Sequence, residues 1–391
     1  MLSPSLESIV NSLADRLGLP VVLEDVNQQL VAYSPHYDLT DRIREETILR
    51  RATAQRILDV FTGFDVAAAT DPVVIPADPA AEMLPRLCIP VRYLDVLLGF
   101  AWVLMPSEDV DDAAMAVARD AQQELSLAML AESRVRARES DTVLSLISSD
   151  PETRVQGLID VETRGTFEPP RSVVVAVCTG PAWEDAAVRG AFWTAAFAGD
   201  SAHQLRGVTA REGVALISVR TDALEEVRGT ADRALGHVRQ HRRDAPLALG
   251  VGPAVRLADH AHESYRYARL SARAALRPTG LGPVAWWDDL GVHRVLTQLP
   301  HQTLADAVDP RVRRLVAENP TFAETLERYL DLSGAVRAVA DDLHIHRTTL
   351  YYRLERIGAY GLDPSRGSDR TTIAMGFAAL RLLGDWPPLR W

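Results

Sequence analysis

The spacing of apolar residues over the first hundred positions predicts a small sheet with one helix. Two apolar runs within residues 18–34 flank the polar segment Asp25–Gln29, which is typical of two strands joined by a turn. A helical pattern follows over residues 41–61. Residues 87–106 then predict a hairpin that turns near Tyr93–Asp95. We therefore expect a β-rich first unit.

A long helix is expected after this unit. Ser107 suits the N-cap position, and the two acidic residues behind it suit the positive end of a helix dipole. The helix should run toward Ser149, with a break near Glu139–Asp141. Its apolar residues recur at threes and fours, at Val110, Ala114, Val117, Ala121, Leu125 and Ala128. Such a stripe suits packing on a partner helix in a dimer, or packing on the helix's own domain, and both remain open.

Residues 166–290 alternate between strand and helix patterns. The order is strand, helix, two strands, helix and strand, followed by a further helix and a last short strand. The two central strands form a hairpin whose turn we place at Arg211–Gly213. This βαββαβ order is that of a ferredoxin-like or cyclase-like domain, in which helices cover an antiparallel sheet.

Four helical patterns with short connections follow from about Asp309. The second and third are separated by a three-residue turn at 344–346, where His346 is expected to cap or pack. Gly334, ahead of the second pattern, suits a cap position. The expected buried positions of this pair are Val336, Val339, Ala340, Leu343, Ile345, Leu350, Leu354 and Ile357. A helix, a short turn and a second helix with this buried pattern predict a helix-turn-helix.

The residues on and around the outward face of its second helix are not the ones that would give the highest helix propensity. This face carries Thr348, Thr349, Tyr352 and Arg356, with Tyr351 at its flank, Arg347 in the first turn and Arg353 at the edge of the buried stripe. Threonine and tyrosine are mediocre helix formers, but their hydroxyl groups and the arginine forks suit base edges and phosphates in a major groove. We predict that these residues contact double-stranded DNA. A plain amphipathic helix with a solvated basic face is the alternative.

The net charge of −11 is unevenly distributed. Residues 1–149 hold 23 acidic residues and 12 arginines, whereas residues 150–391 hold 30 of each. The last 48 residues hold seven arginines and four acidic residues, and the chain contains no lysine. Because exposed charges are screened beyond about 8–10 Å at working salt, a polyanion can approach the C-terminal end without meeting the whole repulsive field.

The composition, 47% hydrophobic and 24% charged residues, is typical of a globular protein. Without a secretion signal pattern or a long apolar run, we expect a cytoplasmic protein with no membrane partner.

Cys88 and Cys178 cannot form a disulfide framework or a zinc site alone. His237 and His241 have a metal-binding spacing but lack a third ligand. Gly250 and Gly252 fit the end of a strand better than a phosphate cradle. We expect no metal, cofactor or catalytic residue.

Residues 325–363 closely resemble the C-terminal helix-turn-helix of PucR/CdaR-type bacterial transcriptional regulators. Two positions depart from that pattern, because Ala335 and Thr348 stand where the family has asparagine. The first change should remove a cap or turn hydrogen bond, and the second should alter base preference. The matching positions are Thr325, Leu326, Tyr329, Leu330, Gly334, Ala340, Leu343, Ile345, His346, Thr349, Tyr352, Arg353, Leu354, Arg356 and Ile357.

Two weaker resemblances concern the rest of the chain. Residues 247–276 are similar to the last strand and helix of GGDEF domains, but the turn sequence TAREGV lacks the glycine pair and the paired acids that hold nucleotide and Mg²⁺. Residues 89–105 are similar to part of a GAF-type sensor. The resemblances imply a degenerate cyclase-like domain without activity and a sensor ahead of it.

We therefore predict an α+β multidomain protein that acts as a ligand-responsive DNA-binding transcriptional regulator. Its partners would be double-stranded DNA, a small-molecule effector, and further copies of itself in a homodimer or higher oligomer. A signalling enzyme with a nucleotide-acting middle domain and a protein-interaction module are the competing hypotheses. The expected parts are a GAF-like α/β sensor (1–106), linker or dimerisation helices (107–165), a degenerate GGDEF/cyclase-like βαββαβ domain (166–290) and an all-α domain (291–391) with its helix-turn-helix at about 334–358.

Overall fold

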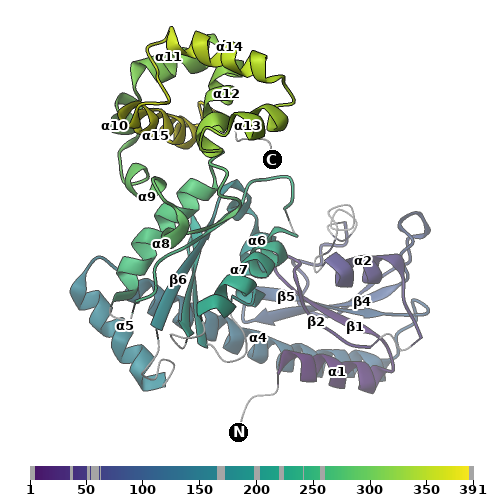
Figure 1. Cartoon of the computed structure of the whole chain (residues 1–391). Helices are drawn as coiled ribbons and strands as arrows, with labels where there is room; N and C mark the ends of the chain where they lie inside the picture. The colour runs from purple at the N-terminus through teal and green to yellow at the C-terminus, as the bar shows by residue number, and fades with distance from the viewer. Residues whose placement is uncertain are drawn as a thin grey trace. The chain divides into compact units, whose positions relative to one another are not determined.

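Over the residues that it describes, the computed structural model shows a mixed α+β chain with two sheets and a helical C-terminal region (Figure 1). The chain divides into two compact units. The first holds Met1–Asp141, Glu184–Thr194 and His237–Arg243, and the second holds the remainder. The described residues are 5–35, 38–50, 53, 61, 63–164, 172–197, 203–219, 224–240, 242–255 and 260–386.

The first unit contains a five-stranded antiparallel sheet in the order β2-β1-β5-β4-β3. One face packs on α1 (Leu6–Leu17) and α4 (Asp112–Leu146) through an aliphatic core. The other face packs on α2 (Arg42–Arg50) through a second core that includes aromatic side chains. The strands are β1 (Val21–Asp25), β2 (Leu30–Tyr33), β3 (Val73–Ile75), β4 (Arg86–Tyr93) and β5 (Val96–Leu104).

The strand pair and the hairpin predicted for this unit are confirmed. Asp25 Oδ1 accepts a hydrogen bond from the backbone N–H of Gln29 (2.9 Å), which helps to close the polar turn. Tyr93 pairs with Val96, so the hairpin turn holds only two residues. The helix expected over 41–61 is observed as α2, and most of the residues that follow α2 lie outside the described part of the chain.

The N-cap predicted at Ser107 is wrong. Asp111 Oδ1 accepts the hydrogen bond from the backbone N–H of Ala114 (2.7 Å), and α4 begins directly after Asp111. Aspartate caps a helix as well as serine does, so local chemistry alone did not separate the two positions. The break expected near Glu139–Asp141 is also wrong, because α4 continues through it to Leu146.

The apolar stripe of α4 packs on its own domain. Ala118, Ala121, Leu125 and Met129 are buried in the core against the first sheet. Of the two arrangements that the pattern left open, the structure therefore shows the intradomain one. A dimer contact on this helix would have to use other residues.

The second unit contains a five-stranded sheet in the order β10-β9-β6-β8-β7. The predicted order of strands and helices is observed; β10 runs parallel to β9, whereas the other pairs are antiparallel. The turn predicted at Arg211–Gly213 lies two residues earlier, at 209–211, because Glu212 already begins β8. Helix α6 and the last residues of α7 are counted in the first unit. The elements from residue 151 are α5 (Pro151–Arg164), β6 (Ser172–Thr179), α6 (Ala186–Thr194), β7 (His203–Val208), β8 (Glu212–Val219), α7 (Leu224–Arg239), β9 (Ala248–Val251), α8 (Ala261–Ala275) and β10 (Val284–Trp286).

Helix α8 lies unusually close to β9 and to the residue that follows it. A Cβ atom on Gly250 would lie 2.1 Å from the carbonyl oxygen of Ala268 and 2.1 Å from the backbone nitrogen of Ala272. A Cβ atom on Gly252 would lie 2.0 Å from the carbonyl oxygen of Ser264. Since backbone atoms cannot rotate away, only glycine allows this approach. The glycine pair thus serves packing, in agreement with the strand geometry expected for it.

The C-terminal region is helical. The four helices predicted from about residue 309 are observed as α12–α15, with three short helices before them. Their core also takes in Ala274 and Ala275 from the end of α8. No helix within the described residues is both long and apolar enough to cross a membrane. The helices are α9 (His293–Leu296), α10 (His301–Asp306), α11 (Pro310–Glu318), α12 (Pro320–Asp331), α13 (Val336–Asp342), α14 (Arg347–Gly358) and α15 (Gly367–Leu383).

We predict that Gly250→Ala destabilises the protein by about 1–3 kcal/mol or more, because its Cβ would force α8 away from β9. Gly236→Ala is the matched control, since Gly236 is exposed within α7 and its Cβ would meet no described atom within 4 Å. The control should gain up to about 1 kcal/mol from helix propensity. Urea unfolding of both variants measures the difference, and equal midpoints would contradict the packing argument.

Candidate nucleic-acid interface

Helices α13 and α14 form the predicted helix-turn-helix. Val339, Ala340 and Leu350 are buried between them, and Leu343 at the end of α13 and Ile345 of the turn pack against this cluster. Further along α14, Ile357 and Leu354 pack into the main core of the helical domain. The predicted inward face of both helices is therefore confirmed.

The turn is closed by backbone geometry and by a histidine cap. His344 adopts a left-handed conformation (φ 52°), and the N–H of Ile345 donates to the carbonyl of Ala340 (2.9 Å). His346 is the N-cap of α14, and its Nδ1 accepts from the N–H of Thr348 (3.4 Å). The capping role predicted for His346 is thus confirmed, and it fixes where α14 starts.

The start of α13 lacks such a cap. Its N-cap is Ala335, which makes no side-chain capping bond, as expected from the missing asparagine. Gly334 precedes the N-cap at φ +77° and donates its N–H to the carbonyl of Tyr329 (2.7 Å), so it ends α12. A Cβ on Gly334 would crowd the Tyr329 ring at 3.1–3.2 Å. Glycine is required here by both backbone and space.

Polar contacts from α12 hold the other helices of the domain. The Arg328 guanidinium donates to both carboxylate oxygens of Asp342 on α13 (2.7 Å each), which lowers the pKa of that carboxyl. Arg381 of α15 donates to Glu327 (2.7 Å), whose pKa is nevertheless raised because the group is buried. The two-hydrogen-bond pair of Arg328 with the exposed Asp342, and the buried carboxylate of Glu327, together hold these helices on α12.

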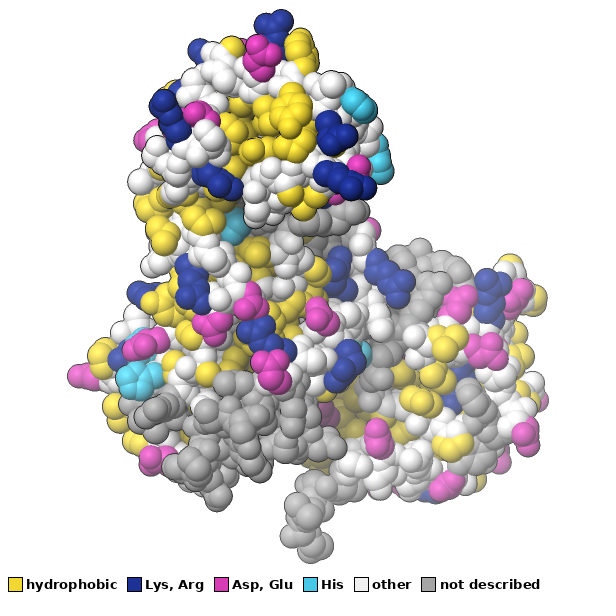
Figure 2. Space-filling model, in the orientation of Figure 1, with side chains coloured by type: hydrophobic (Ala, Val, Ile, Leu, Met, Phe, Trp, Pro, Cys, Tyr) yellow, Lys and Arg dark blue, Asp and Glu magenta, His cyan; other side chains and the backbone are white. Residues whose placement is uncertain are grey.

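The outward face of α14 carries the predicted DNA-contacting residues. Arg347, Thr348, Thr349, Tyr351, Tyr352 and Arg356 are all exposed. The Arg356 guanidinium lies 5.4 Å from the centroid of the Tyr352 ring, within the range of a cation–π contact. Figure 2 shows arginine side chains on the visible face of the C-terminal helical domain.

Arg353 lies differently from the rest of the predicted set. It is half-buried, and its Nη1 donates to the Oγ1 of Thr325 on α12 (2.9 Å). This contact orients α14 on α12, a positioning role that the sequence analysis missed. The hydroxyl of Thr325 was visible in the sequence only as one matched position of a family pattern.

The other candidate sites are less well supported by the geometry. His237 Nε2 lies 3.0 Å from Thr194 Oγ1, and His241 lies outside the described residues. No group of three potential metal ligands occurs among the residues that the structure describes.

In the first unit, a cavity of only about 20 Å³ adjoins Glu24, whose carboxylate accepts hydrogen bonds from Thr53 and Trp102. Burial raises the pKa of Glu24 to about 7.

Comparison with known proteins agrees with the geometry of the C-terminal domain. Residues 322–379 match the family described as the PucR C-terminal helix-turn-helix domain. The chain is 30% identical over 111 residues to the DNA-binding transcriptional activator AdeR of Bacillus subtilis. The aligned region covers 27% of this chain and 26% of AdeR. This chain is also 35% identical over 137 residues to an uncharacterized protein of Mycobacterium tuberculosis. That alignment covers 32% of this chain and 30% of the relative.

These matches have a limited extent. The chain spans less than a third of the length of these curated relatives. A crystal structure of a regulator of polyketide synthase expression from Bifidobacterium adolescentis aligns with 62% of this chain and 97% of that one, at 21% identity. Its TM-score of 0.28 is too low to support a shared fold. The family match, the buried pattern and the capped turn coincide, and residues 322–379 of this chain therefore form a PucR-type C-terminal helix-turn-helix domain.

Proposed function

We propose that this chain is a DNA-binding transcriptional regulator whose helix α14 enters the major groove. The observation that carries the proposal is the exposed face of α14, which combines two arginines, two threonines and two tyrosines in a PucR-type domain. Among the described residues, no carboxylate forms an ion pair with Arg347 or Arg356, so both guanidinium groups are available to phosphates or guanine edges. The name of the Bacillus subtilis relative is consistent with this function.

The parts ahead of this domain are proposed to be regulatory. The strand order β2-β1-β5-β4-β3, with helices on both faces, supports a GAF-like sensor, and the order β9-β6-β8-β7 supports a ferredoxin-like or cyclase-like domain. We expect the protein to respond to a small molecule in the cytoplasm. A cavity of about 20 Å³ holds little more than a water molecule, so an effector in this cavity would require a rearrangement around Glu24.

We expect Arg347→Ala and Arg356→Ala each to weaken binding to the cognate operator by about 5–150-fold, which corresponds to about 1–3 kcal/mol for a lost base contact. If either arginine instead contacts a phosphate, the slope of log K against log salt should fall by about one unit. Fluorescence anisotropy at several salt concentrations measures both. Arg119→Ala, at an exposed position of α4, should bind like wild type. Wild-type affinity in both α14 variants would refute the assignment of the recognition helix.

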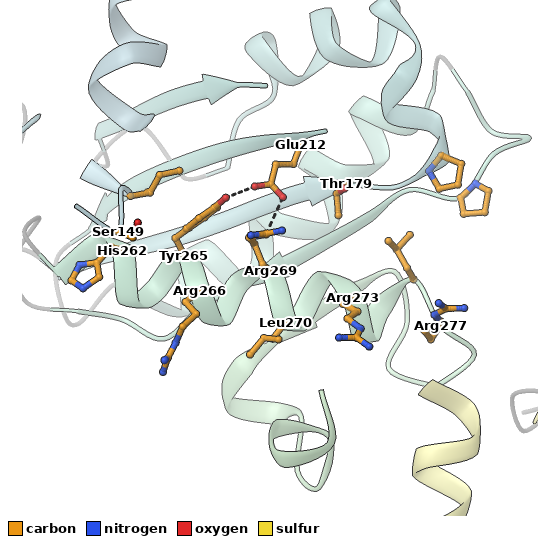
Figure 3. Close-up of a pocket in the computed structure, with 14 residues that line it drawn as sticks. Ser149, Thr179, Glu212, His262, Tyr265, Arg266, Arg269, Leu270, Arg273 and Arg277 are labelled. Atoms are coloured by element: carbon orange, nitrogen blue, oxygen red, sulfur yellow. Dashed lines mark hydrogen bonds and ion pairs between the residues drawn. The ribbon is translucent and has the colours of Figure 1, made fainter. Parts of the chain in front are cut away.

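The middle domain is proposed to lack nucleotide-cyclising or nucleotide-hydrolysing activity. Glu212, the only carboxylate of the TAREGV turn sequence, borders a cavity beside α8 (Figure 3). It accepts from the Tyr265 hydroxyl and pairs with Arg269 (3.4 Å), which leaves it poorly placed to hold Mg²⁺. The purified full chain should therefore not turn over GTP or cyclic dinucleotides with Mg²⁺. Turnover that disappears in Glu212→Gln would support the competing hypothesis of a signalling enzyme.

The working unit is proposed to be a dimer or a dimer of dimers on a repeated or palindromic site. A single recognition helix contacts few base pairs, whereas two helices held about 34–36 Å apart supply two half-sites. Since the buried stripe of α4 is occupied, we assign the dimer contact to its exposed apolar residues Leu127 and Val135. Sedimentation of the full chain should give at least twice the 42.9 kDa mass, and Leu127→Glu with Val135→Glu should give the monomer. A monomeric wild-type chain that protects one half-site would disprove the dimer.

A further inference from the structure

The two adjacent threonines at the start of α14 differ in what their hydroxyl groups contact. Thr348 Oγ1 lies 2.8 Å from Nδ1 of His346, the N-cap residue of the helix. The backbone N–H of Thr348 donates to the same nitrogen at 3.4 Å. Among the described residues, the Thr349 hydroxyl has no hydrogen-bond partner. Both side chains are exposed, so bonding rather than burial separates them.

These contacts fix which nitrogen of the His346 ring carries the proton. A neutral imidazole has one nitrogen that donates and one that accepts. Since Nδ1 accepts from the backbone N–H of Thr348, it carries no proton, and Nε2 does. The Thr348 hydroxyl must then be the donor in the 2.8 Å contact, because Nδ1 has only a lone pair to offer. The single proton of this hydroxyl is therefore used within the protein.

An occupied hydroxyl proton limits what Thr348 offers to a DNA base. Without that proton, the side chain cannot donate to the acceptor atoms that guanine, adenine and thymine present in the major groove. The groups that remain are the Cγ2 methyl and the lone pairs of the oxygen. A β-branched side chain has few rotamers, and the contact with His346 selects one of them, so the methyl group is held in one position. A threonine methyl group suits apolar contact with the C5 methyl group of thymine.

We propose that Thr348 contacts a thymine through its methyl group and that His346 is the residue that positions it. The place in the helix suits this role, because the N-terminal residues of a recognition helix contact the base edges and Thr348 is the second residue of α14. An asparagine here, as in the family pattern, would instead pair through its amide with adenine. The inference rests on the proposed function, since it assigns a base contact to the helix that is proposed to enter the major groove.

The lone pairs of Thr348 Oγ1 allow a competing contact, in which an amino group of adenine or cytosine donates to this oxygen. That oxygen already faces the imidazole at 2.8 Å, so a base amino group would have to approach it beside the ring. Contact through the methyl group needs no further geometry at the oxygen, which favours thymine. Variants that separate the methyl group from the hydroxyl group decide between the two contacts.

The test starts from the duplex that the full chain selects from a random pool at fixed salt. Each thymine of that duplex is replaced in turn by deoxyuridine, which lacks only the C5 methyl group, and affinity is measured by fluorescence anisotropy. At one thymine per recognition helix, wild type should lose roughly fourfold in affinity, the effect of one buried methyl group. A selected duplex in which no thymine methyl group affects the affinity overturns the proposal.

Two variants of Thr348 assign the contact. Thr348→Ser keeps the hydroxyl group but lacks the methyl group, so it should bind that thymine and its uracil analogue equally. Thr348→Val lacks the hydroxyl group and holds its methyl groups through its own rotamer preference, so it should still prefer thymine. Thr349→Ser is the matched control at the adjacent exposed position and should keep the wild-type preference. A preference that survives in Thr348→Ser, or one that is lost in Thr348→Val, overturns the proposal.

His346 is tested through the same ratio of affinities for thymine and uracil. His346→Ala removes the acceptor, so the Thr348 side chain can rotate and the ratio should fall toward one. His346→Asn supplies a side-chain oxygen that caps a helix well and should restore the ratio. General destabilisation of α14 would weaken binding of both duplexes equally and leave the ratio unchanged. An unchanged ratio in His346→Ala therefore overturns the positioning role.

The same measurements separate this inference from the proposed function. A chain that selects no duplex refutes the proposed function, and the thymine contact fails with it. Operator binding that weakens in Arg347→Ala, but does not depend on any thymine methyl group in wild type, supports the proposed function and overturns the thymine contact alone.

Discussion

The arrangement of the DNA-binding domain depends on polar groups buried along one helix, α12. Each of them has its partner on a different neighbouring helix, so each contact removes one freedom of packing. A buried polar group that loses its partner costs far more than a surface contact, and the domain therefore tolerates only one arrangement of α13, α14 and α15 around α12. The contacts are Thr325 with Arg353, Glu327 with Arg381, and Arg328 with Asp342.

Helix α8 has a comparable position in the second unit, but steric contact rather than charge fixes it. Gly250 and Gly252 let its backbone touch the strand region directly, so its side chains cannot shift in register without clashes. The end of α8 also enters the core of the C-terminal helices, so this one helix connects the sheet of the second unit with the helical region.

The helix-turn-helix was predictable because its signal is local: the buried spacing, the turn and the outward residues all lie within one short segment. The partner of Arg353 was not predictable in this way, since Thr325 lies 28 residues away and a helical wheel shows only which face a residue occupies. Ser107 and Asp111 have similar capping chemistry, so only the structure separates them. Helix α1 was missed, although Ser5 caps it and its apolar spacing is regular. The cavity beside α8 joins strand ends and a helix that are distant in sequence, which periodicity does not reveal.

Every fixed cation of this chain is an arginine, so residue type alone does not separate structural from ligand-binding positive charges. Their partners do. Arg328 and Arg381 face carboxylates at hydrogen-bond distance and belong to the packing of the domain. Arg347 and Arg356 on α14 are exposed and have no ion-pair partner among the described residues. An exposed guanidinium without a protein anion keeps its charge and its forked donors available to an external phosphate. The partner of each arginine thus separates the charges that pack this domain from the charges that are proposed to meet DNA.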